Sequence, residues 1–132
     1  MKEILTQLPV RTSKARENGL TMMMDKGLSL RQAEDFLSSN HEHTDIIKLG
    51  FGTSIITPNI AEKIKLYQNN GMLVYAGGTL FEAFAIRKQL DDYKKYMNHI
   101  GLEMVEISDG SMSMNHNIKC DIIADFSKDF KV

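Results

Sequence analysis

Charged and polar residues follow four short apolar runs of the sequence, at the points where those runs end. The runs lie in "GLTMMMDKG", "TDIIKLGFG", "GMLVYAGGT" and "GLEMVEISDG". In parallel α/β sheets the carboxyl ends of the strands carry the chemistry, so these residues are expected to share one rim. The rim residues are Asp25 and Lys26, then Lys48, Gly50, Gly52, Thr53 and Ser54, then Gly77, Gly78 and Thr79, and last Glu106, Ser108 and Asp109.

The types of these rim residues suit a hard metal ion and a small anionic substrate. Glu106 and Ser108 are two residues apart and therefore point to the same side of a strand, and oxygen ligands of this kind suit Mg²⁺. Lys26 and Lys48 can meet phosphate or carboxylate as point charges. The "GGT" at 77–79 would expose backbone N–H groups at a helix N-terminus, which favours an anion.

Each rim residue also has a purely structural interpretation. Asp25 and Lys26 could pair with each other or with neighbouring strands, and Lys48 could form an ion pair with a neighbouring strand inside a barrel. The "GGT" could serve only as a tight turn and helix cap. The four histidines show no metal-ligand spacing and receive no role; they are His41, His43, His99 and His116.

Segments with helical spacing lie between the apolar runs, and each of the first three opens with a capping signal. These signals are Ser29 with Gln32, Thr57 before Pro58, and Thr79 with Glu82, the last opening a longer helix with a break near Gln89. Ile118, Ile122 and Phe126 mark one face of a fourth helix, which Phe130 would extend.

The apolar runs recur about every 25 to 31 residues, the length expected of strand-helix units. A further step of this size reaches Lys131, where a fifth strand would begin. We therefore predict an α/β fold of consecutive strand-helix units with parallel strands, the N-terminal (βα)4 half of a TIM (β/α)8 barrel truncated at strand 5. An open doubly wound sheet is the alternative, weakened because no G-x-G-x-x-G follows the first run.

The chain is predicted to be a single domain over 1–132, with a lead-in segment at 1–18 and four strand-helix units at 19–132. The "RTSKAR" within the lead-in is either a solvated terminus or an anion-binding arm. With 16 Lys+Arg against 17 Asp+Glu, the composition gives no reason to expect nucleic acid or a membrane as partner. One cysteine, Cys120, is expected to fill the core, and a soluble, cytoplasmic protein is predicted.

The strings "GLTMMMDKGLSL", "DIIKLGFGTS", "VYAGGTLFEA" and "VEISDGS" together closely resemble the phosphosulfolactate synthase family, in order and spacing as well as in wording. The resemblance runs from about Leu8 to Val132. It implies a (β/α)8 barrel and a Mg²⁺-dependent addition of sulfite to phosphoenolpyruvate that gives phosphosulfolactate, a step toward coenzyme M in methanogens. Bacterial relatives need not make coenzyme M.

Combined with the resemblance, the rim residues take specific roles. Lys26 and Lys48 would bind substrate anions and act in catalysis, while Glu106 and Asp109 would lie at the metal, with Asp25 as the alternative to Asp109. Hydrogen bonds to the substrate are expected from Gly78, Thr79 and Ser108.

The sequence departs from the family pattern at its end. Family members continue with a fifth strand of the type L-S-E-V-G and a nearby lysine that is the favoured proton donor, and neither is present here. A half barrel would expose an unpaired strand at each end, so homo-oligomerisation through barrel edges is expected. The alternative function is that of a non-catalytic homologue or barrel fragment with a stress-related or assembly role, because plant heat-stress-associated proteins are similar to this family.

Overall fold

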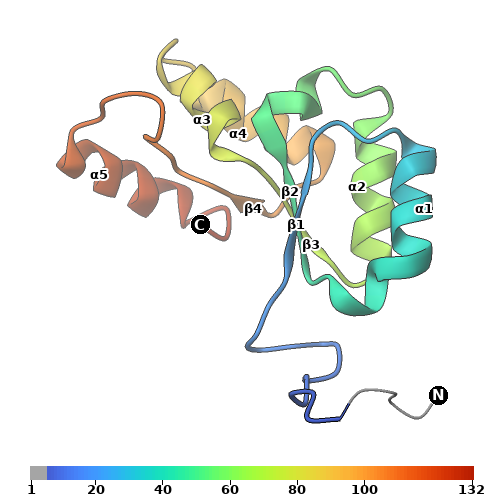
Figure 1. Cartoon of the computed structure of the whole chain (residues 1–132). Coiled ribbons are helices and arrows are strands. Elements are labelled where there is room, and N and C mark those ends of the chain that lie inside the picture. The colour runs from blue at the N-terminus through green and yellow to red at the C-terminus, as the bar shows by residue number, and fades with distance from the viewer. Residues whose placement is uncertain (1–5) are drawn as a thin grey trace.

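The computed structural model describes residues 6–132 and contains one parallel four-stranded sheet (Figure 1). The strands lie side by side in chain order and are β1 (Met22–Asp25), β2 (Ile46–Leu49), β3 (Leu73–Ala76) and β4 (Met104–Val105). Residues 1–5 of the predicted lead-in segment fall outside the described residues. The prediction of consecutive strand-helix units with parallel strands is confirmed.

Within residues 6–132, five α-helices connect or follow the strands, with two short 3₁₀ segments between them. They are α1 (Leu30–Asn40), η1 (His41–His43), η2 (Gly50–Ile55), α2 (Ile60–Asn69), α3 (Gly78–Ala85), α4 (Leu90–Ile100) and α5 (His116–Phe126). Their apolar faces pack on the sheet side that carries Ile47, Leu49, Val74, Ala76 and Val105, all of which are buried. Alternation along each strand places Met22, Met24 and Leu73 on the opposite side, where they are exposed.

The first helix begins as predicted and the next two do not. Ser29 and Gln32 form both hydrogen bonds of a capping box at α1. The prediction that Thr57 caps the second helix is wrong. Asn59, in the left-handed conformation, precedes α2, and the Thr57 hydroxyl instead donates to the Thr53 carbonyl oxygen at 2.7 Å. The predicted capping box of Thr79 and Glu82 is also wrong. Gly77 is the N-cap residue of α3, and the Glu82 carboxylate accepts a hydrogen bond from the Gly110 N–H.

The later elements largely follow the predicted pattern. The break near Gln89 is present, since α3 ends at Ala85 and α4 begins at Leu90. Helix α5 buries Phe126, and Phe130 is buried just beyond the helix. Cys120 is exposed, so its assignment to the core is wrong.

A fifth strand position begins at the predicted residue. Lys131 forms a parallel bridge to Met104, and its N–H donates to the carbonyl oxygen of Glu103 at 2.9 Å. The N–H of Val105 donates in turn to the Lys131 carbonyl oxygen. Within residues 6–132, the helices are all too short or too polar to cross a bilayer.

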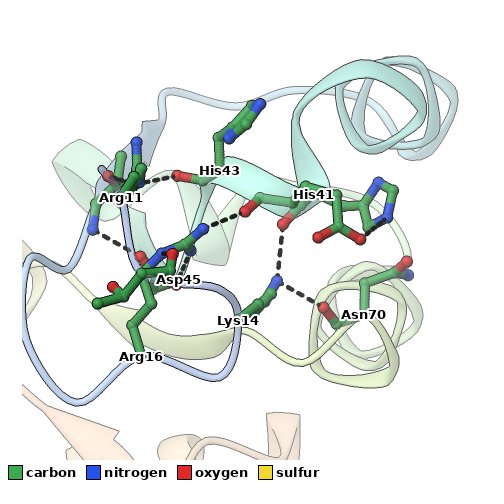
Figure 2. A network of polar contacts seen from close by, with 10 residues as sticks. Arg11, Lys14, Arg16, His41, His43, Asp45 and Asn70 are labelled. Carbon is green, nitrogen blue, oxygen red and sulfur yellow. Dashed lines mark hydrogen bonds and ion pairs between the residues drawn. The ribbon is translucent and has the colours of Figure 1, made fainter. Parts of the chain in front are cut away.

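The basic residues of "RTSKAR" are bound by oxygens of the chain itself (Figure 2). Lys14 donates to the carbonyl oxygens of His41 and Asn70, at 2.8 and 2.9 Å, and thereby joins the C-terminal ends of α1 and α2. A cation at these positions also interacts favourably with both helix dipoles. Arg16 forms a buried ion pair with Asp45 at 2.7 Å. The segment therefore closes the amino-terminal end of the sheet, away from the rim, and its anion-binding interpretation is not supported.

Replacing Arg16 with methionine should destabilise the chain by about 3 kcal/mol at neutral pH, because it leaves the buried Asp45 carboxylate without its counter-ion. Burial raises the pKa of Asp45, but hydrogen bonds from Thr21 N–H and Arg16 outweigh burial and hold it below its ordinary value. The pair's contribution is therefore present above the ordinary carboxyl pKa and lost as pH falls through the lowered one. Urea unfolding at several pH values tests this, with the exposed Arg31→Met as control.

The uncovered face of the sheet bears on the predicted self-association, which stays a prediction. Within residues 6–132 no helix packs over Met22, Met24 and Leu73, and β1 is an edge strand. We expect a second copy to cover this face, giving at least twice the 15.0 kDa chain mass in size-exclusion chromatography with light scattering. Leu73→Asp should reduce that mass, whereas Ile86→Asp, at an exposed site away from the sheet, should not. A stable wild-type monomer would contradict the expectation.

Candidate functional site

The carboxyl ends of β2, β3 and β4 bring Lys48 and Glu106 together. The Lys48 Nζ lies 2.7 Å from the Glu106 Oε2, so the two charges form an ion pair that spans β3. Lys48 is in register with Tyr75, and its Nζ lies 5.8 Å from the centre of the Tyr75 ring. The side chains of Lys48 and Glu106 are only partly buried. This pair on the uncovered side of the sheet is the centre of the candidate site.

Two consecutive glycines allow the chain to pass closely under this pair. A Cβ on Gly77 would lie 2.8 Å from the Lys48 Cε and 3.2 Å from the Leu49 carbonyl oxygen. A Cβ on Gly78 would overlap the Ser108 side chain and lie 3.0 Å from the Glu106 Oε1. The "GG" thus provides the close approach that the N-terminus of α3 makes to both charged residues.

The ion pair fixes the charge state of Lys48. The Glu106 carboxylate beside it is the main cause that raises the pKa of Lys48, against the opposing effect of burial. Burial raises the pKa of Tyr75 as well, so its hydroxyl stays neutral. At neutral pH the site therefore presents one ammonium, one carboxylate and one phenol. Such a set can bind an anion through Lys48 and a cation through Glu106.

The Ser108 side chain is bound within the chain, and its predicted contact with a substrate stays a prediction. Its hydroxyl donates to the Glu82 Oε1, and its oxygen accepts a hydrogen bond from the Gly110 N–H at 3.2 Å. A serine hydroxyl has one hydrogen, so Ser108 cannot also donate to a substrate anion in this arrangement. It offers an oxygen lone pair instead.

Asp25 and Asp109 are held away from Glu106 by other partners. Asp25 is fully buried, with its Oδ2 2.8 Å from the Lys63 Nζ and its Oδ1 accepting from the N–H groups of Gly27 and Leu28. Asp109 pairs with Lys119 of α5 at 2.6 Å, and this ion pair is the main cause that lowers the pKa of Asp109. Neither carboxylate is brought to the Lys48 pair.

Lys26 and Thr79 are exposed at the same end of the sheet. The Lys26 Nζ lies 5.7 Å from the ring centre of Phe51, and Lys26 lines a cleft of about 430 Å³ between the loops after β1 and β2, together with Gln32 and Thr53. Thr79 lies in the first turn of α3 with its side chain in solvent. Their predicted contacts with a substrate stay predictions.

The available oxygens suit a magnesium ion that is shared with a substrate. Within residues 6–132 no group of three or more His, Cys, Asp or Glu side chains is placed to hold a metal. Mg²⁺ is often bound by one or two carboxylates together with substrate oxygens and water, rather than by an all-protein cage. Glu106, with Ser108 beside it, fits that mode of binding.

Two residues of the site were missed in the sequence. Tyr75 follows from strand alternation, because it occupies on β3 the position that Lys48 occupies on β2. Glu82 gives no such signal, since its spacing from Thr79 matches a capping box and its actual partners lie in the loop after β4.

Comparison with known proteins establishes the family of this chain. Residues 9–132 match the family model of (2R)-phospho-3-sulfolactate synthase (ComA). The chain belongs to the phosphosulfolactate synthase family. A phosphosulfolactate synthase of Bacillus subtilis is 36% identical over 132 residues, which are 100% of this chain and 52% of the relative.

Two archaeal members of the phosphosulfolactate synthase family are also similar. The one from Methanothermobacter thermautotrophicus is 33% identical over 117 residues, which cover 87% of this chain and 45% of the relative. The one from Methanocaldococcus jannaschii is 39% identical over 101 residues, which cover 75% and 40%. The chain thus spans about half the length of these relatives, and its architecture is that of the N-terminal part of a TIM barrel.

Proposed function

We propose that this chain carries part of the site for the Mg²⁺-dependent addition of sulfite to phosphoenolpyruvate, the reaction that gives phosphosulfolactate. The observation that carries the proposal is the Lys48–Glu106 ion pair, held over Gly77 and Gly78 at the carboxyl rim of the sheet in a member of this family. Lys48 would bind a substrate anion, and Glu106 would hold the metal.

The reaction requires positive charge near the substrate carboxylate. Sulfite forms a carbon–sulfur bond at the methylene carbon, the electrons of the double bond move toward the carboxylate, and the carbon that bears the phosphate then takes a proton. Glu106 would hold a metal ion, which when bound would supply Lewis-acid stabilisation of that negative charge. The Lys48 ammonium adds a second, fixed positive charge in a partly buried site.

Lys48 is better suited to bind an anion than to donate the proton. Its raised pKa keeps it charged well above neutral pH, and a group is an efficient acid only when its pKa lies near the working pH. Tyr75, neutral and beside Lys48, would donate a hydrogen bond to the same anion.

Isothermal titration with phosphoenolpyruvate, with and without MgCl₂, tests the proposal. We expect binding that depends on Mg²⁺, and Lys48→Met should weaken it at least tenfold because the ammonium is lost while the length of the side chain is kept. Glu106→Gln should remove the dependence on Mg²⁺. Lys65→Met, an exposed change on α2, is the matched control. Circular dichroism establishes that each variant is folded.

Two results would overturn the proposal. One is the absence of any heat from a folded wild-type sample. The other is a Mg²⁺ dependence that survives in Glu106→Gln, which would place the metal on other groups.

A further inference from the structure

Glu82 is a buried acid that no part of the proposed reaction uses. It lies on α3, is 6% exposed, and faces the loop between β4 and α5. Its Oε1 accepts from the Ser108 hydroxyl and from the Gly110 N–H at 2.8 Å. Its Oε2 accepts from the hydroxyl and the N–H of Ser111, the latter at 3.0 Å. One carboxylate therefore takes four hydrogen bonds from three residues of a single loop.

These hydrogen bonds keep the carboxylate ionised in spite of its burial. Burial raises the pKa of Glu82, but the hydrogen bonds from Ser108, Ser111 and Gly110 together outweigh it and hold the pKa below its ordinary value. Hydrogen bonds to a charged acceptor are stronger than neutral ones, so these bonds restrain the loop more firmly than neutral hydrogen bonds within the loop would.

The restrained loop leads directly to the candidate site. Ser108 is two residues beyond Glu106 and packs against Gly78, which is one helical turn before Glu82. The bond from Ser108 to Glu82 also decides that Ser108 turns an oxygen lone pair, rather than a hydrogen, toward its surroundings. Glu82 thus reaches the site through Ser108.

We propose that Glu82 is a positioning residue for the reaction: it fixes the loop of residues 108–111 so that Glu106 and the Ser108 oxygen stand together beside Lys48. The inference rests on the proposed function, because it assigns a role to Glu82 within that same site. It also makes a claim about the loop itself that can be measured without any ligand.

The ligand-free measurement is amide hydrogen exchange by NMR at Gly110 and Ser111. Glu82→Gln keeps the size of the side chain but replaces one acceptor oxygen with a donor group, so exchange at these two amides should rise at least tenfold while β2 and β3 stay protected. Glu62→Gln, an exposed acid on α2, should change nothing.

The second measurement is Mg²⁺-dependent phosphoenolpyruvate binding by the same variants. Glu82→Gln should weaken it about tenfold, and Ser111→Ala, which removes one hydrogen bond and leaves Ser108 bound, should weaken it less. A loosened loop with unchanged affinity would overturn the positioning role, and unchanged protection in Glu82→Gln would overturn the restraint itself. Failure of the wild type to bind defeats the proposed function, and the exchange data still decide whether Glu82 holds the loop.

Discussion

Replacing Lys63 with methionine should destabilise the chain by about 3–5 kcal/mol at neutral pH. Lys63 is 1% exposed, and its Nζ lies 2.8 Å from the Asp25 Oδ2 and 2.7 Å from the Leu28 carbonyl oxygen. Removing the ammonium leaves a fully buried carboxylate without its counter-ion. Urea unfolding measures the loss, and Lys65→Met, an exposed lysine of the same helix, provides the control.

The pH dependence distinguishes this explanation from simple loss of packing. Burial raises the pKa of Asp25, but the Lys63 ion pair and the N–H groups of Leu28 and Gly27 outweigh it, so the pKa is lowered overall. The stabilisation from Asp25 is therefore present above the ordinary carboxyl pKa and lost as pH falls through the lowered one. In Lys63→Met burial dominates, so the penalty should shrink toward acid pH as Asp25 takes up a proton. A penalty that is constant with pH would contradict this account.

The same substitution should disturb Lys26, which stands between Asp25 and Gly27. The Asp25 carboxylate accepts from the N–H groups of Gly27 and Leu28, and the Tyr67 hydroxyl donates to it at 3.0 Å. Loss of the Lys63 pair weakens the anchor of this turn. We expect the signals of Lys26 and its neighbours to broaden in NMR spectra of any fraction of Lys63→Met that stays folded.

Replacing Gly78 with alanine should cost about 3 kcal/mol and abolish the Mg²⁺-dependent binding of phosphoenolpyruvate. The new methyl group would overlap the Ser108 side chain, at 2.7 Å from its Oγ, and press on Glu106. Either α3 or the strand end must move, and both hold parts of the site. Thermal unfolding and titration calorimetry measure the two effects.

Gly110→Ala is the matched control for Gly78→Ala. A Cβ on Gly110 would lie 3.6 Å from the Ser108 Oγ and 3.7 Å from the Glu82 Oε1, which are ordinary contact distances. The control should keep both stability and binding. If Gly78→Ala behaves like it, the close packing of α3 against the strand end is not required for binding.

The fold could be predicted because the sequence signals that specify it lie within each strand-helix unit. Apolar runs bounded by glycine and helical spacing between them recur along the chain, and each strand pairs with the next one in sequence. Even the start of a fifth strand at Lys131 follows from this spacing. The starts of α2 and α3 could not be predicted, because Thr57 and Glu82 have partners that lie outside their own helices.

The candidate site could be predicted only as a set of residues at one rim. Lys48 lies at the rim and forms the ion pair that was its structural alternative, while its contact with a substrate anion stays a prediction. Which carboxylate pairs with Lys48 depends on contacts made in the folded chain. Asp25 pairs with Lys63 and Asp109 pairs with Lys119. Glu106 pairs with Lys48. Sequence spacing contains no information on those choices.

The strand order in the sheet has a consequence for how the chain can fold. Within residues 6–132 each strand forms its backbone ladder only with its sequence neighbours, so pairing extends from one strand-helix unit to the next, as in a linear array of repeats. Lys14 ties the ends of α1 and α2 together, and that contact needs no residue beyond Asn70. During synthesis the first two units can therefore make their contacts while later units are still in the ribosome, and each new strand pairs with a neighbour that precedes it in the chain.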